Sequence, residues 1–80
     1  MLTLYTKDNC PYSTVVIHKL DELSIPVKLK NISDNRNALE LIEKGGKYQA
    51  PCLIDTERAV AVYESADIMD YLNTYMSKNS

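Results

Sequence analysis

Residues 2–20 of this chain read LTLYTKDNCPYSTVVIHKL, and this stretch decides the fold. Its first residues alternate between leucine and more polar side chains, a period of two that predicts a β-strand ending near Thr6. Pro11 suits the first position of a helix, where no backbone donor is needed, and apolar residues then recur at helical spacing. We therefore predict a helix over residues 11–23, with Cys10 at its start.

The next segments continue an alternation of strands and helices. Residues 25–29 alternate again and begin near a proline, so they predict a second strand, which a helical crossover makes parallel to the first. Ser33 or Asp34 can cap a second helix, which Gly45-Gly46 ends. Its predicted apolar face consists of Ala38, Leu39, Leu41 and Ile42.

The last third of the chain predicts a hairpin and a closing helix. Residues 52–54 and 59–62 are apolar and flank a short polar turn, as in a β-hairpin. Ser65 is a predicted N-cap, and the helix after it has an apolar face and ends near residue 76. We expect residues 77–80 to fray.

Composition limits the possible partners. The 80 residues suffice for one domain (1–80), with a net charge of -2 and lysines scattered along the chain, so nucleic acid is not an expected partner. No apolar run approaches the roughly 20 residues that cross a bilayer, and no secretion signal is visible. We expect a monomer in the cytoplasm, without membrane contact.

Cys10 is the strongest candidate for chemistry. Free backbone N–H groups and the positive end of the helix dipole favour a thiolate, and they lower a thiol pKa from about 8.5 to between roughly 3.5 and 7.5. A free cysteine is often a small buried hydrophobe, but a position between Asn9 and Pro11 is hard to bury. Only two cysteines in a chain without a secretion signal argue against a structural disulfide.

Four short motifs together resemble a known family. Thr6-Lys7, Cys10-Pro11-Tyr12, Gln49-Ala50-Pro51 and Glu64-Ser65 are similar to motifs of the glutaredoxins. In detail they look like the amino-terminal domains of glutathione transferases and of transferase-like glutaredoxins. The resemblance implies a thioredoxin-like α/β fold of order β-α-β-α-β-β-α, in which a four-stranded mixed sheet is flanked by three helices.

The resemblance also implies roles for residues near the thiol. Lys7 would hold the glycyl carboxylate of glutathione and support the Cys10 thiolate, although a solvated surface charge is its simplest reading. Tyr12 would contact glutathione, and otherwise it is a surface ring.

Two further motifs would bind the rest of glutathione. Pro51 resembles the cis-proline that faces the nucleophile in this fold, which leaves the Ala50 backbone to pair with the cysteinyl part. Glu64 and Ser65 would receive the γ-glutamyl group, since a helix start binds anions; a plain cap explains the same residues structurally.

Ser13 and Cys52 leave alternatives open. Ser13 stands where a dithiol glutaredoxin has its resolving cysteine, so a monothiol is implied, whether natural or engineered; its hydroxyl can stabilise the Cys10 thiolate. Cys52 could resolve a mixed disulfide, but strand alternation favours a core position. His18 is expected at the surface, and no zinc signature is present.

We therefore predict a glutaredoxin-type, glutathione-dependent thiol-disulfide oxidoreductase with a monothiol mechanism at Cys10, assisted by Ser13. Its partners would be glutathione, as reductant, and glutathionylated or disulfide-containing proteins, a role in redox homeostasis and electron transport. One alternative is a glutathione-ligated [2Fe–2S] carrier, although Pro11 and Tyr12 depart from the usual Cys-Gly-Phe-Ser motif. The other is a glutathione transferase-like or glutathione-binding domain.

Overall fold

The computed structural model describes residues 2–79, and the side chains of residues 2–75. Strands and helices follow one another in the predicted order. In chain order they are β1 (Leu2–Thr6), α1 (Pro11–Glu22), β2 (Val27–Asn31), α2 (Asn35–Gly45), β3 (Cys52–Asp55), β4 (Val60–Val62) and α3 (Ser65–Asn79).

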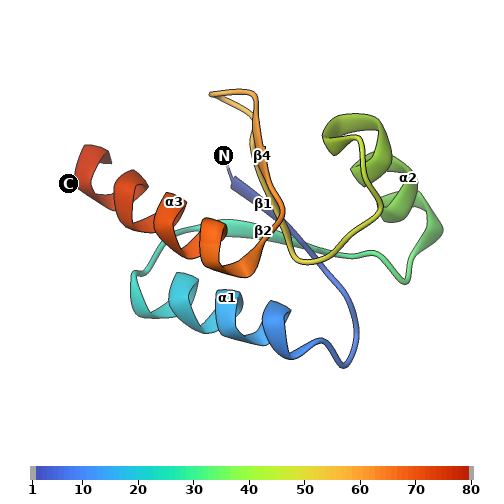
Figure 1. Cartoon of the computed structure of the whole chain (residues 1–80), viewed down its shortest axis with the longest axis horizontal. Coiled ribbons are helices and arrows are strands. Elements are labelled where there is room, and N and C mark those ends of the chain that lie inside the picture. The colour runs from blue at the N-terminus through green and yellow to red at the C-terminus, as the bar shows by residue number, and fades with distance from the viewer. Residues whose placement is uncertain (1, 80) are drawn as a thin grey trace.

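The four strands form one mixed sheet in the order β2-β1-β3-β4. β1 pairs in parallel with β2 and antiparallel with β3, and β4 closes the sheet as a hairpin with β3. α1 and α3 lie side by side on one face of the sheet, and α2 lies on the other (Figure 1). The predicted thioredoxin-like α/β fold with three helices around a four-stranded mixed sheet is confirmed.

Strand alternation divides the core into two parts. Leu4 of β1 and Leu53 of β3 point toward α1 and α3, and they pack with Val16, Ile68 and Leu72. Because successive side chains of a strand face opposite ways, the neighbouring residues of β1 and β3 pack under α2. This second cluster contains Tyr5, Ile32, Leu41, Cys52 and Ile54.

The structure differs from the sequence-based predictions at β2 and at α2. β2 begins two residues later than predicted, because buried Ile25 belongs to the turn after α1. Leu29 of β2 is 53% exposed, since this strand is an edge of the sheet. On α2 only Leu41 is buried, and Leu39 and Ile42 are exposed, so the predicted four-residue apolar face is wrong.

Helix ends follow the capping chemistry in most places. The Asp34 carboxylate accepts a hydrogen bond from the Arg36 N–H at 2.9 Å, and Gly46 ends α2 with φ 88°, a left-handed conformation that suits glycine. Ser65 is the first residue of α3 instead of its cap. α3 runs to Asn79, so residues 77–79 are helical where fraying was expected, and Ser80 lies outside the described residues.

Within residues 2–79 no helix has the length and apolar character to cross a membrane.

Candidate active site

The loop before Cys10 is tied to the far end of β2. The Asp8 carboxylate accepts hydrogen bonds from the Asn31 side-chain amide at 2.6 Å and from the Ser33 hydroxyl at 3.0 Å. Asn9 has φ 57°, and asparagine is among the few residues apart from glycine that tolerate this left-handed conformation. The loop therefore turns sharply and delivers Cys10 to the start of α1.

Cys10 occupies the N-cap position of α1. Its backbone is extended, with φ -104° and ψ 109°, and Pro11 follows as the first helical residue, as predicted. The Cys10 carbonyl accepts the Thr14 N–H at 3.2 Å, which begins the helical hydrogen bonding. The residue is half-buried, so Cys10 is partly accessible to solvent while it lies at the start of a helix.

The surroundings of Cys10 favour its thiolate. Hydrogen bonding from the Ser13 hydroxyl is the largest cause that lowers the pKa of Cys10, followed by the Ser13 backbone N–H. The Tyr12 backbone N–H and the charge of Lys7 lower this pKa further, and burial opposes them. The Ser13 oxygen is buried and makes no hydrogen bond to any described residue, so its proton is free to turn toward the sulfur.

A cavity of about 320 Å³ opens between three segments of the chain. The start of α1 contributes Tyr12, whose ring is 64% exposed. The segment before β3 contributes residues 49–51, and the junction of β4 and α3 contributes residues 63–65. Tyr12, Ala50, Pro51, Glu64 and Ser65, which the motifs singled out, thus line one cavity although they are far apart in the sequence.

The peptide bond between Ala50 and Pro51 is cis, as predicted. Pro51 is buried, and Ala50 is partly buried against Tyr5 and its neighbours under α2. Cys52, the next residue, is fully buried, which confirms its predicted core position. Burial raises the pKa of the Cys52 thiol to about 11.

The predicted site residues fall into two groups. Lys7, Cys10 and Ser13 form the thiol environment, and none of them lines the cavity. Tyr12 belongs to both groups, since its backbone N–H supports the sulfur and its side chain lines the cavity. Gln49 and Tyr63 also line the cavity and were not predicted as site residues. Gln49 begins the motif Gln49-Ala50-Pro51 and Tyr63 directly precedes Glu64-Ser65, so their place next to predicted site residues was the available signal.

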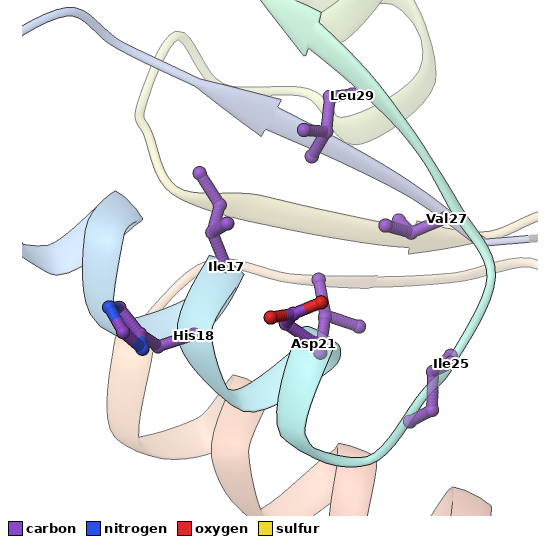
Figure 2. A pocket seen from close by; sticks show the side chains of 7 residues that line it. Ile17, His18, Asp21, Ile25, Val27 and Leu29 are labelled. Carbon is purple, nitrogen blue, oxygen red and sulfur yellow. The ribbon is translucent and has the colours of Figure 1, made fainter.

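Another hollow, of about 330 Å³, lies between α1 and β2 (Figure 2). Its lining is largely apolar, with Ile17 from the helix and Val27 and Leu29 from the strand. His18 and Asp21 of α1 also line this hollow, and the His18 side chain is exposed, as predicted. It contains no thiol, and among the described residues no three His, Cys, Asp or Glu side chains gather as a metal site would require.

Comparison with known proteins gives one family match. Residues 4–79 match the model of the family described as glutathione S-transferase, N-terminal domain. The chain belongs to this family. The match supports the transferase-like side of the resemblance, while glutaredoxin identity stays a prediction. No curated protein matches the chain.

Solved structures show the same fold. A glutathione S-transferase from the Antarctic clam Laternula elliptica is 28% identical with a TM-score of 0.77, and the match covers 96% of this chain. Glutathione transferase Omega 3C from Trametes versicolor (22% identical, TM-score 0.83, 99% covered) and Ure2p in complex with glutathione (22%, 0.80, 99%) share the fold. This chain spans 36%, 35% and 34% of those chains respectively.

Proposed function

We propose that this domain binds glutathione and uses Cys10 to reduce glutathione mixed disulfides by a monothiol mechanism. The observation that carries the proposal is a partly exposed thiol with a lowered pKa at a helix start, two residues before Tyr12, which lines a cavity together with Ala50 and Ser65. Membership of the glutathione S-transferase N-terminal domain family supports glutathione as the ligand.

The cavity offers suitable groups for the ends of glutathione. Backbone N–H groups and the Ser65 hydroxyl at the start of α3 suit the γ-glutamyl carboxylate, and Glu64 suits its ammonium group. The Ala50 backbone suits the extended cysteinyl part, which would pair with it as an added strand does. Lys7, exposed in the loop before Cys10, supplies a positive charge for the glycyl carboxylate.

The reaction balances with glutathione as the only reductant. The Cys10 thiolate attacks the glutathionyl sulfur of a mixed disulfide, so a Cys10–glutathione disulfide forms and the substrate thiolate leaves and takes a proton from solvent. A second glutathione, as thiolate, attacks the glutathionyl sulfur of this adduct. Glutathione disulfide leaves and the Cys10 thiolate returns; a low thiol pKa favours both its attack and its departure.

A second candidate is a transferase-like or glutathione-binding domain without disulfide chemistry. The family match favours it, because the family description names a transferase. Glutathione binding is common to both candidates, and the reactivity of Cys10 separates them.

The test is to incubate the reduced protein with glutathione disulfide, measure its intact mass and map the adduct by peptide analysis. We expect one glutathione on Cys10, and loss of both adduct and disulfide turnover in Cys10→Ser. The matched control is Cys52→Ser, which should keep the adduct. Turnover retained by Cys10→Ser would refute the mechanism, and saturable glutathione binding without an adduct would favour the second candidate.

A further inference from the structure

The hydroxyl of Tyr63 makes an unusual number of contacts for a side chain at the wall of the cavity. It donates a hydrogen bond to the Lys47 carbonyl and accepts one from the Lys47 N–H, both at 3.1 Å. The Tyr63 ring packs against the cluster under α2, to which the buried Cys52 belongs. The Tyr63 hydroxyl therefore fixes both backbone polar groups of Lys47, at the start of the loop that leads to β3.

The part of the loop that lines the cavity begins two residues after Lys47. Lys47 and Cys52 bracket residues 48–51, and three of these residues, Gln49, Ala50 and Pro51, form one wall. Tyr63 itself precedes Glu64 and Ser65, which form the opposite wall. The Tyr63 hydroxyl thus ties the junction of β4 and α3 to Lys47, two residues before the cavity-lining part of the loop.

The end of α2 leaves room for this hydroxyl. A Cβ atom at Gly45 would overlap the Tyr63 hydroxyl oxygen, so the tyrosine ring would have to shift. The Lys47 ammonium lies 5.4 Å from the centre of the Tyr63 ring, a cation–π distance. Gly45 is therefore required for close packing, in addition to its position near the end of the helix.

We propose that Tyr63 is a positioning residue that fixes the cavity-lining residues 49–51 for glutathione binding. The inference rests on the proposed function, since it names what keeps that site assembled. Without the hydroxyl, the loop gains conformational freedom that glutathione must remove on binding, so affinity falls. The Cys10 thiol is held by other contacts, through Ser13 and Tyr12, and its reactivity should not change.

The test is Tyr63→Phe, which removes the hydroxyl and keeps the ring. We expect the KM for glutathione to rise about fivefold, the effect of one lost hydrogen bond, with kcat changed by less than about twofold. The pH titration of the Cys10 thiolate, followed at an ultraviolet wavelength, should match the wild type. Tyr48→Phe removes a hydroxyl from an exposed tyrosine of the same loop and is the matched control.

Two further measurements do not depend on that variant. Gly45→Ala should displace the Tyr63 hydroxyl and raise the same KM. In the wild type, the Lys47 amide should be protected from hydrogen exchange, and an unprotected amide would overturn the proposal.

Each kinetic outcome has one meaning. An unchanged KM in Tyr63→Phe overturns the proposal, as does a KM rise accompanied by an equal loss of kcat and a shifted thiolate titration, because that pattern indicates general loss of structure. If the wild type shows no saturation with glutathione at all, the proposed function fails and this inference falls with it.

Discussion

At the scale of single residues, the Ser13 hydroxyl is the group on which the reactivity of Cys10 most depends. It is buried and makes no hydrogen bond to any described residue, and its effect on the thiolate is the largest cause of the lowered Cys10 pKa. A buried hydroxyl without a partner costs about 1–3 kcal/mol. The thiolate supplies that partner, so this serine contributes to the charge state of Cys10 more than to folding.

Ser13→Ala should therefore raise the pKa of Cys10 without lowering the free energy of unfolding. The activity and the alkylation rate of wild-type protein increase as pH rises through the Cys10 pKa, and in the variant this increase should occur at higher pH. At pH 7 we expect alkylation about tenfold slower, which corresponds to one hydrogen bond of about 1.4 kcal/mol. The measurement is the iodoacetamide rate against pH.

Thr14→Ala is the control for this experiment. The Thr14 hydroxyl bonds to the Cys10 carbonyl at 3.3 Å and not to the sulfur, so its removal should leave the titration in place. Identical titration curves for Ser13→Ala and the wild type would show that the helix start alone sets the thiol pKa.

At the scale of elements, one carboxylate joins β1, β2 and α2. Glu40 of α2 accepts hydrogen bonds from the Tyr5 hydroxyl at 2.5 Å and from the Lys30 ammonium, and Lys44 lies 3.7 Å away. Hydrogen bonding to Lys30, then to Tyr5, lowers the pKa of Glu40 to about 2. Since α2 buries only Leu41 completely, this polar contact is a substantial part of its attachment.

Glu40→Gln should lower the free energy of unfolding by roughly 1–2 kcal/mol at neutral pH. A carboxyl group with a lowered folded pKa stabilises the fold above its unfolded pKa, near 4.5, and loses this effect as pH falls toward 2. The difference between variant and wild type, measured by denaturant unfolding, should therefore shrink across that range. Glu43→Gln, at an exposed position of the same helix, is the control, and a pH-independent difference would contradict the assignment.

The sequence could predict some features of these elements and not others. Local signals identified α1, because proline chemistry and hydrophobic spacing are local, whereas the cis Ala50-Pro51 bond was expected only from the family resemblance. The apolar pattern wrongly placed Leu39 on the buried face of α2, where it is exposed. A helix that packs on one edge buries a narrower stripe of side chains than its apolar residues suggest. The contact of Tyr63 with Gly45 joins residues from two elements, and no local pattern encodes such an approach.

At the scale of the whole molecule, the two thiols differ in exposure, so one can react in the folded protein and the other only after the core opens. Cys10 is partly exposed at a helix start, whereas Cys52 is fully buried in the cluster under α2. Burial raises the pKa of Cys52 to about 11, so neither access nor ionisation favours its reaction in the native state. Cys52 becomes reactive only when the sheet and α2 separate.

Native protein treated with iodoacetamide near pH 8 should therefore show one fast modification, at Cys10, and a second that is at least about a thousandfold slower. That ratio follows from the cost of opening a folded core, about 5–15 kcal/mol in small proteins. In guanidinium chloride both thiols should react at similar rates, which is the internal control. If Cys52 reacts as fast as Cys10 in native protein, or forms a disulfide with Cys10 under glutathione disulfide, then α2 opens readily and Cys52 is a resolving thiol.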